Sequence, residues 1–270
     1  GRTHEVVHIA RESGAQLLVI AMPSVDARVM RRVIGLCETS GVPFRTVPRL
    51  ADVLEGRSLP GQLKEVAIED LLGRQTHSPD WKAIRGWLGA RSVLVTGGGG
   101  SIGSELARQC ARHGAHRIAL VEIDELSLLT VEAELRRDFP GITCTPILGD
   151  CGDPAVIAHA LRLAEPEAVF HAAAYKQVPL LQGQLREAVR NNVLATATVA
   201  GRSREAGIES CVLISTDKAV DPANVLGATK RMAEMVCQGL AAKQSTRFVT
   251  VRFGNVLDSA GSVVPLFREQ

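Results

Sequence analysis

The stretch that most constrains the fold is residues 93–103, which read Val-Leu-Val-Thr-Gly-Gly-Gly-Gly-Ser-Ile-Gly. An aliphatic run breaks into Thr96 and four glycines, and helical spacing of apolar residues begins near Ser101. Glycine permits positive φ angles and close approach of a ligand to the backbone, while a helix N-terminus supplies N–H groups and a partial positive charge. This succession of strand, tight turn and helix predicts a cradle for phosphate groups.

The spacing of the glycines indicates which class of ligand this turn would bind. Gly97, Gly100 and Gly103 fit the pattern G-x-x-G-x-x-G, and Gly98 starts an overlapping G-x-G-x-x-G. Glu122 ends the next apolar run about 20 residues further on, where an acid binds ribose hydroxyls in dinucleotide-binding units. This context favours a dinucleotide site over the alternative, a glycine-rich turn without a ligand.

Residues 89–270 alternate between strand and helix patterns. Strands separated by helices of this length predict crossover connections and an α/β fold with a doubly wound parallel sheet of the Rossmann type. Ligands of such sheets lie beyond the carboxyl ends of the strands, so chemistry is expected just after each strand. Strand patterns cover residues 93–95, 117–121, 142–147, 168–170, 211–214 and 248–251, and helix patterns cover residues 101–112, 125–137, 154–163, 185–205 and 227–242.

Residues 1–88 form a first segment with its own alternation. A helix pattern (3–11), an apolar strand pattern (16–21), a second helix pattern (26–40) and a turn with a strand (41–47) predict part of a smaller α/β domain. The remainder, up to residue 88, reads as an irregular linker whose two tryptophans are packing anchors.

Composition limits the partners. The chain has 31 basic and 29 acidic residues among 270 and a net charge of +2, without a basic block, so no nucleic-acid partner is expected. No apolar run reaches the roughly 18 residues of a membrane span. The six cysteines are scattered without a C-x-x-C pair, which predicts reduced, buried thiols in a cytoplasmic protein and no metal site.

Chemistry-bearing residues follow the predicted strands. Asp150 follows the third, where it accepts a hydrogen bond from an adenine amino group or merely enters a turn. After the fourth, His171 is interpreted as a satisfied buried histidine, and Ala172, Ala173 and Ala174 are small enough for a cofactor to lie against the backbone. Tyr175, which is the chain's one tyrosine, and Lys176 come next, where they either contact substrate or pack.

The densest polar cluster follows the fifth strand, where Ser215, Thr216, Asp217 and Lys218 emerge together. Either these residues cap a turn with solvated charges, or they form a reactive site. The cluster lies at the carboxyl end of a strand and combines hydroxyl, carboxylate and amine groups, so a reactive site is favoured. Lys230 on the following helix either holds nicotinamide ribose hydroxyls and shifts nearby pKa values or is a solvated lysine.

Together these residues resemble the extended short-chain dehydrogenase/reductases. More narrowly, they resemble bacterial polysaccharide-biosynthesis UDP-N-acetylglucosamine 4,6-dehydratases of the long, membrane-anchored type, and the resemblance covers nearly the whole chain. The strings that carry it are EDLLGR (69–74), VTGGGGSIGSEL (95–106), FHAAAYKQVPL (170–180), AVRNNVLATATVA (188–200), STDKAVDPANVLGATKRMAE (215–234) and VRFGNVLDSAGSVVPLF (251–267).

The resemblance implies a lyase (hydro-lyase) reaction in glycan biosynthesis. A bound NAD(P) oxidises the sugar at C4, water leaves across C5–C6, and the hydride returns to C6. Asp217 is then the general acid at C6, Lys218 the base at C5, and Thr216 a hydrogen-bond partner of the C4 oxygen, with Lys230 completing the catalytic set. The implied substrate-binding residues are Tyr175, Lys176 and Asn255.

The predicted cofactor is NAD or NADP. Glu122 would repel a 2′-phosphate and so favours NAD. The resemblance also implies a UDP-sugar substrate, a homo-oligomer, and transmembrane helices and a C-terminal substrate-binding part outside this chain, with the complete protein anchored on the cytoplasmic face of the inner membrane. The predicted cofactor-binding residues are Thr96, Gly97, Gly100, Ser101, Ile102, Gly103, Glu122, Asp150, Cys151, Ala172, Ala173, Ala174 and Lys230.

The sequence departs from this family at several positions. Leu226 stands where most short-chain enzymes have a catalytic tyrosine and the long dehydratases commonly have methionine, so this side chain can only pack. Further departures are Gln177, Gln182, Asp258 and Ala260. Two rival readings remain, a nucleotide-sugar C4 epimerase on the same scaffold and a non-catalytic dinucleotide-binding sensor. Asp217 and Lys218, which neither rival needs, favour the dehydratase.

Overall fold

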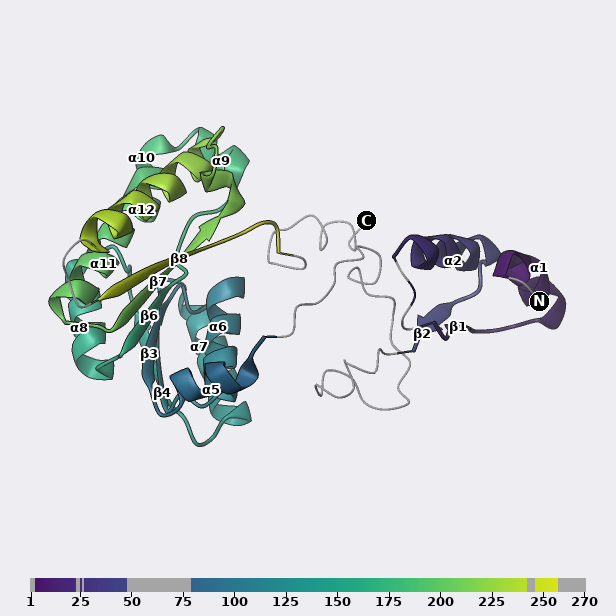
Figure 1. Cartoon of the computed structure of the whole chain (residues 1–270), viewed down its shortest axis with the longest axis horizontal. Coiled ribbons are helices and arrows are strands. Elements are labelled where there is room, and N and C mark those ends of the chain that lie inside the picture. Colours follow the sequence, from purple (N-terminus) through teal and green to yellow (C-terminus); the bar gives the residue numbers. More distant parts are fainter. Residues whose placement is uncertain (1–2, 23–24, 26, 48–78, 242–245, 257–270) are drawn as a thin grey trace. The chain divides into compact units, whose positions relative to one another are not determined.

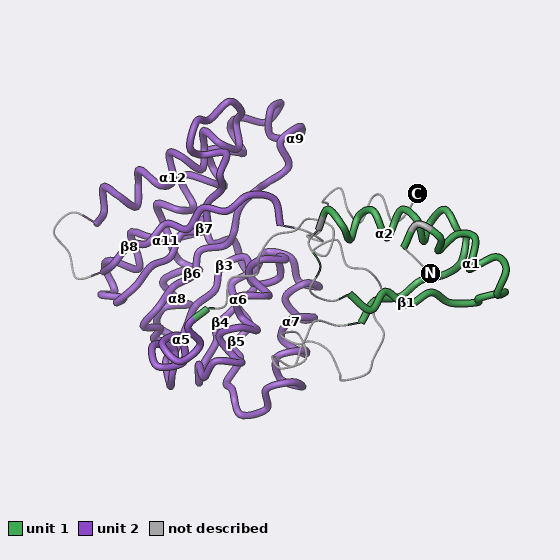
Figure 2. Tube along the Cα trace, turned by 45° about the vertical axis from the view of Figure 1, so that its right-hand side comes forward, with its two compact units in different colours: residues 1–79 green, residues 80–270 purple. Residues whose placement is uncertain are grey.

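The computed structural model describes residues 3–22, 25, 27–47, 79–241 and 246–256, and the chain divides into two compact units, residues 1–79 and 80–270 (Figure 2). The sequence predicted the break after residue 88, nine residues later. Helix α5 (Trp81–Leu88) accounts for the difference, because Leu88 is buried in the core of the second unit. The Trp81 ring also stacks on His113, with the ring centroids 4.4 Å apart.

The first unit contains a short parallel sheet. Strands β1 (Leu18–Ile20) and β2 (Phe44–Thr46) pair in parallel, and helices α1 (Val6–Ser13) and α2 (Ala27–Ser40) accompany them (Figure 1). A 3₁₀ turn, η1 (Thr3–Glu5), precedes α1. The core of this unit consists of Ile20, Met30, Val33, Ile34 and Cys37. The helix and strand patterns expected in this segment are therefore present.

The second unit is built on a parallel sheet that has six strands within the described residues. The strand order is β5-β4-β3-β6-β7-β8, which is the order of dinucleotide-binding Rossmann sheets, with the topological switch point between β3 and β6. This confirms the predicted doubly wound sheet. The strands are β3 (Ser92–Thr96), β4 (Arg117–Glu122), β5 (Thr143–Leu148), β6 (Ala168–His171), β7 (Ser210–Thr216) and β8 (Arg247–Phe253).

Helices cover both faces of this sheet (Figure 1). On one face, α6 (Ser101–Arg112) and α7 (Glu125–Asp138) join α5 over a core that includes Val95 and Ile118. On the other face, α8 (Pro154–Ala164) and α11 (Ala195–Glu205) pack over Leu94 and Val169. Consecutive strand residues thus face opposite cores, which explains why the central strands are continuous apolar runs.

The helix predicted over residues 185–205 is present over those residues, with a π-helical turn inside it. It consists of α10 (Leu185–Val189), a π-helical turn η2 (Arg190–Leu194) and α11, and a further short helix, α9 (Val178–Gln182), precedes it. Asn191 and Asn192 lie in the π-helical turn, and their side chains bond the backbone of another loop. Tertiary hydrogen bonding thus coincides with a π-helical turn inside an otherwise continuous helix.

The last helix, α12 (Val225–Ala241), packs on α11 and β7 through Ala233 and Cys237. A 3₁₀ turn, η3 (Asp217–Ala219), connects β7 toward it. All six cysteines are free and buried. Within the described part of the chain, no helix combines the length and apolarity needed to cross a membrane.

Candidate active site

The glycine turn (residues 97–100) connects β3 to α6 and is shaped by contacts within the protein. Gly97 has φ +68°, and a Cβ there would lie 2.7 Å from the Cα of Ala173. A Cβ on Gly103 would overlap the carbonyl oxygen of Gly97. Both positions therefore need glycine for the fold itself, because α6 and the loop after β6 approach the turn this closely.

Gly100 differs from these two glycines. Its φ of −72° and ψ of 162° suit any residue, and a Cβ there would meet only the carbonyl oxygen of Gly97, at 3.3 Å. The protein thus leaves room at Gly100, directly before the first turn of α6, which contains Ser101 and Ile102. A helix N-terminus next to an open glycine fits the pyrophosphate of a dinucleotide.

Glu122, at the end of β4, is fixed beside this turn. Its Oε2 accepts a hydrogen bond from the Gly99 N–H at 2.9 Å, and its Oε1 accepts from Ile123 N–H at 2.8 Å and Asp124 N–H at 3.2 Å. These bonds hold the carboxylate at the carboxyl end of a strand, where a ribose would lie. Carboxylate oxygens have further lone pairs available for hydroxyl groups.

Asp150 and Cys151 follow β5 and have different roles. The Asp150 carboxylate accepts from Gly152 N–H at 2.7 Å and from Arg190 Nη1 at 3.1 Å, so both of its oxygens are engaged. The Cys151 side chain lies in the apolar core, and burial raises the pKa of its thiol to about 12. Any contact of Cys151 with a cofactor must therefore come from its backbone.

The loop after β6 lies against the end of β3. Ala172 N–H donates to the carbonyl oxygen of Thr96 at 3.1 Å, and Ala172, Ala173 and Ala174 are half-buried. The Thr96 hydroxyl pairs with His171 Nδ1 at 2.6 Å, and His171 Nε2 pairs with Thr196 at 3.0 Å. Burial and the nearby Lys230 lower the pKa of His171 to about 3, so His171 is a neutral structural link.

Tyr175 is anchored through its backbone. Its N–H donates to Asn191 Oδ1 at 3.0 Å and to Asn192 Oδ1 at 2.9 Å, and its carbonyl accepts from Asn192 Nδ2 at 3.1 Å. Asn192 Nδ2 also lies 3.1 Å from the Thr229 hydroxyl on α12. The side chain of Tyr175 is 42% exposed, and Lys176 is exposed beside it.

Asn192 was missed by the sequence reasoning. It is 1% exposed and links the loop after β6 to α12. The available signal was a pair of asparagines inside an otherwise apolar helical pattern. Asparagine competes for backbone hydrogen bonds and disfavours a helix interior, so the pair pointed to an interruption.

Four predicted residues come together after β7. Lys218 Nζ donates to Asp217 Oδ1 at 3.2 Å and to Asn255 Oδ1, which follows β8, at 3.0 Å. The Thr216 hydroxyl donates to Asp217 Oδ1 at 3.0 Å. Hydrogen bonds from Thr216 and Lys218 lower the pKa of Asp217 below its ordinary value. The cluster thus presents an ionised carboxylate and an ammonium group side by side.

The 216–218 segment rests on α12 at Gly227. A Cβ on Gly227 would overlap the carbonyl oxygen of Lys218. One turn further along α12, Lys230 is 5% exposed, and burial lowers its pKa to about 8. Its ammonium group makes no hydrogen bond or ion pair with the residues that the structure describes. A buried cation in this position is available for a ligand.

Two residues at which this chain departs from the family pattern, Leu226 and Gln182, have structural roles. Leu226 is buried in an apolar cluster with Leu181 and Ala188, so it contributes no proton-transfer group. Gln182 Oε1 accepts from the Val225 N–H at 3.2 Å and thereby caps the start of α12. Asp258 and Ala260 lie outside the described residues.

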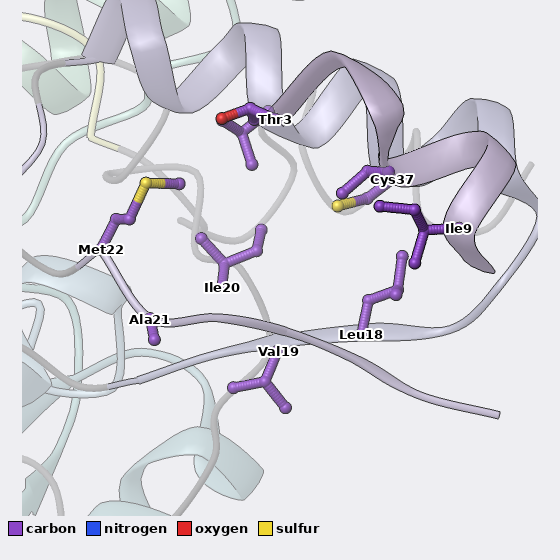
Figure 3. Close-up of a pocket in the computed structure, with 10 residues that line it drawn as sticks. Thr3, Ile9, Leu18, Val19, Ile20, Ala21, Met22 and Cys37 are labelled. Carbon is purple, nitrogen blue, oxygen red and sulfur yellow. The ribbon is translucent and has the colours of Figure 1, made fainter. Parts of the chain in front are cut away.

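The first unit contains an apolar hollow of about 340 Å³ (Figure 3). Leu18 and Ile20 of β1 point into it, whereas Val19 points away. The Thr3 hydroxyl and the Cys37 thiol are the polar groups among its lining side chains, and burial raises the pKa of Cys37. This hollow therefore lacks the groups that acid–base or phosphate chemistry needs.

Comparison with known proteins identifies relatives of the chain. The family described as "Polysaccharide biosynthesis protein" matches residues 93–270. The capsular polysaccharide biosynthesis protein CapD of Staphylococcus aureus is 40% identical over 272 residues, covering 100% of this chain and 45% of that protein. The UDP-N-acetylglucosamine 4,6-dehydratase (inverting) of Campylobacter jejuni is 32% identical over 183 residues, covering 66% of this chain and 53% of that enzyme. The chain spans about half the length of the curated relatives it matches.

Epimerases are also among the similar proteins. A UDP-glucose 4-epimerase of Rickettsia rickettsii is 32% identical over 187 residues, covering 67% of this chain and 53% of that enzyme. Among solved structures, Pen from Bacillus thuringiensis matches with a TM-score of 0.63 and 29% identity, covering 68% of this chain and 56% of that chain. The UDP-glucose-4-epimerase of Stenotrophomonas maltophila, with bound NAD and formylated UDP-arabinopyranose, matches with a TM-score of 0.54 and 25% identity. The match covers 60% of this chain and 52% of that chain.

Proposed function

We propose that this chain, which belongs to the polysaccharide biosynthesis protein family, carries the catalytic site of an NAD-dependent nucleotide-sugar 4,6-dehydratase acting on UDP-N-acetylglucosamine. The expected resemblance to the extended short-chain dehydrogenase/reductases is confirmed by the family match and by relatives at 40% and 32% identity. The observation that carries the proposed reaction is the pair Asp217 and Lys218, joined to Asn255 at the carboxyl ends of β7 and β8.

The residues present fit a nicotinamide dinucleotide. The glycine turn and the start of α6 would hold its pyrophosphate, Glu122 its adenosine ribose, and the half-buried alanines after β6 would let it lie against the backbone. When bound, the cofactor supplies a hydride acceptor at C4 of the sugar and a hydride donor at C6. The carboxylate of Glu122 disfavours a 2′-phosphate, which supports NAD over NADP.

Lys230 and Thr216 would act on the sugar's C4 side. The unpartnered ammonium of Lys230 would donate to ribose hydroxyls and, through its charge, stabilise negative charge that develops on the C4 oxygen. Thr216 would hydrogen-bond that oxygen. Because Leu226 has no group that accepts a proton and Asp217 takes up the Lys218 proton in the elimination, the C4 hydroxyl proton would pass to water.

Asp217 and Lys218 would carry out the elimination as a pair. Moving one proton along their 3.2 Å hydrogen bond converts the ammonium and carboxylate into an amine and a carboxylic acid. The Lys218 amine then removes the C5 proton, and Asp217 protonates the departing C6 hydroxyl, so water leaves and the ion pair is restored. When the hydride returns to C6, the Lys218 ammonium would give a proton back to C5, and the proton released from the C4 hydroxyl would replace it on Lys218. Exclusion of water by the substrate favours the neutral pair, because desolvation disfavours charged forms.

Tyr175, Lys176 and Asn255 would contact the UDP-sugar. Tyr175 and Lys176 are exposed on a loop whose backbone is fixed by Asn191 and Asn192, and Asn255 is exposed beside Lys218. A fixed backbone with exposed side chains suits a recognition loop, because the side chains are presented without a cost for ordering the chain.

The second candidate function is a C4 epimerase, which the relative from Rickettsia rickettsii favours. An epimerase oxidises and re-reduces C4 without losing water, so it has no use for an acid at C6 or a base at C5. The adjacent Asp217 and Lys218 therefore support the dehydratase.

The test is to incubate the full-length protein with UDP-N-acetylglucosamine and NAD and to follow the sugar nucleotide by mass spectrometry. Loss of one water, about 18 Da, supports the dehydratase. An unchanged mass with formation of the C4 epimer, detected by NMR, would establish the epimerase instead. An unchanged sugar with NAD still bound would favour the dinucleotide-binding sensor and overturn both catalytic proposals.

A further inference from the structure

A fully buried carboxylate on α12 joins the segments that carry the candidate site. Glu234 is 0% exposed and accepts four hydrogen bonds. They come from Ser215 Oγ at 2.6 Å, from Arg252 Nε at 2.8 Å and Nη2 at 2.5 Å, and from Arg231 Nη1 at 3.2 Å. Burying a carboxylate is expensive unless its oxygens are fully partnered, and here they are.

Each element that Glu234 joins by a hydrogen bond or carries on its own helix leads directly into the candidate site. Ser215 ends the buried part of β7, immediately before the 216–218 segment. Arg252 lies near the end of β8, three residues before Asn255. Lys230 precedes Glu234 by four residues on α12, so the two side chains share one face of the helix.

We propose that Glu234 is a positioning residue that sets the alignment of Lys230, the 216–218 segment and Asn255 relative to one another. It acts through Ser215, Arg252 and α12 and touches no substrate. The identity of the reaction in this inference rests on the proposed function, whereas the alignment itself does not. Small displacements of reacting groups reduce rates strongly, which gives such a residue a measurable effect.

Glu234 is ionised under the conditions in which the enzyme would be assayed. Burial acts to raise its pKa, but hydrogen bonds from Arg252, Ser215 and Arg231 hold the pKa at about 2. Burial lowers the pKa of the Lys230 ammonium, and the nearby Cys237 and then the Glu234 carboxylate act in the opposite direction to raise it. Glu234 is therefore connected to the site by hydrogen bonds and by charge.

A matched ion pair elsewhere in the same unit provides the control. Arg108 of α6 and Glu134 of α7 form the same two-pronged contact, with Nε–Oε1 at 2.6 Å and Nη2–Oε2 at 3.0 Å. These helices cover the face of the sheet opposite α11, and the pair involves no residue of β7, β8 or α12. Glu134→Gln therefore reports the cost of losing an Arg–Glu pair with a less buried carboxylate, without disturbing the cluster after β7.

The experiment compares Glu234→Gln, Ser215→Ala and Glu134→Gln in the full-length protein. Urea unfolding measures stability, calorimetric titration measures NAD affinity, turnover of UDP-N-acetylglucosamine gives kcat and KM, and NMR titration follows the Lys230 ammonium, assigned with Lys230→Met.

Ser215→Ala should keep the fold and NAD affinity while kcat falls about tenfold at unchanged KM, because only the tether to β7 is lost. Glu234→Gln should also lower the pKa of Lys230, and Glu134→Gln should change stability alone.

Two results would overturn the proposal. One is a Ser215→Ala enzyme with the kcat of the wild type. The other is a Glu234→Gln protein whose Lys230 titrates as in the wild type and whose kcat falls only in proportion to its folded fraction. If the wild type turns over no UDP-sugar, the proposed function fails, and the position of the 216–218 segment in a crystal structure of Ser215→Ala still decides the alignment, because an unmoved segment would overturn it.

Discussion

The two ends of the candidate site, the turn after β3 and the cluster after β7, are held in different ways. The turn depends mainly on neighbouring residues in the sequence, since Gly97 and Gly103 fit against each other within seven positions, although Gly97 also fits closely against Ala173. The cluster depends on distant ones, since Lys218 bonds Asn255 and rests against Gly227. The first is a local backbone conformation, and the second is an assembly of three elements.

This difference indicates where each region is vulnerable. A substitution in the turn acts directly on the backbone that would hold a cofactor. A substitution that displaces the cluster can come from α12 or β8, far along the chain from Asp217. Four variants or conditions test this contrast, beginning with the largest expected effect.

Gly103→Ala should have the largest effect. The new Cβ would overlap the carbonyl oxygen of Gly97, and we expect a loss of about 3 kcal/mol in stability together with NAD binding. Gly100→Ala makes the same chemical change where the Cβ needs an adjustment of only a few tenths of an ångström, so it should lose much less stability than Gly103→Ala and lose mainly NAD affinity. Urea unfolding and calorimetric NAD titration separate the two. Equal stability losses in both variants would contradict a turn in which only Gly100 faces the ligand.

Asp217→Asn should stop catalysis while leaving the turn intact. Removing a general acid typically lowers kcat by about 10²- to 10⁴-fold. NAD affinity should not change, because Asp217 lies after β7 and not at the glycine turn. Asp221→Asn, an exposed acid four residues on, is the control and should retain activity. Undiminished turnover by Asp217→Asn would reject the acid assignment.

Gly227→Ala should disturb the cluster from α12. The added Cβ would overlap the carbonyl oxygen of Lys218, so the 216–218 segment must shift, and we expect kcat to fall about tenfold to a hundredfold with NAD affinity retained. Gly239→Ala on the same helix meets nothing within 4 Å and should instead stabilise the protein by about 0.5–1 kcal/mol. Kinetics and unfolding curves for both variants provide the comparison. Unchanged kcat in Gly227→Ala would show that the segment does not depend on α12.

A pH titration of NAD affinity should give the smallest effect. Burial lowers the pKa of Lys230 to about 8, so its ammonium is present below that pH and lost above it. If the ammonium donates to ribose hydroxyls, affinity should be constant in the acid range and fall about tenfold as the pH rises through 8, the usual worth of a charge-assisted hydrogen bond. Lys230→Met should bind weakly with no step near pH 8. A flat wild-type profile would remove Lys230 from the cofactor site.

The same contrast explains which residues of the candidate site could be predicted from the sequence. Gly97, Gly100, Gly103 and Glu122 could be named because a strand, a turn and a helix start are consecutive in the sequence. Thr216, Asp217 and Lys218 could be named because they follow a strand, and their ion pair is local. The contact of Lys218 with Asn255, across 37 residues, was not predicted, because the family resemblance indicated Asn255 only as a substrate-binding residue.

The missed residues are those whose partners are distant. Asn192 contacts Tyr175 and Thr229, and Glu234 contacts Ser215 and Arg252, so neither role is visible in its own neighbourhood. Both are also buried polar groups inside apolar helical patterns. Such positions satisfy their hydrogen bonds only through tertiary contacts, which periodicity does not encode.

By itself, the sequence determined the doubly wound sheet, the order of its elements and the glycine turn. Those features follow from hydrophobic periodicity and from the backbone freedom of glycine, both of which act over a few residues. Tertiary structure alone decided the π-helical turn at residues 190–194, the placement of α5 in the second unit, and the network around Glu234. These depend on satisfying buried polar groups and on packing between distant segments, and only the folded chain brings their partners together.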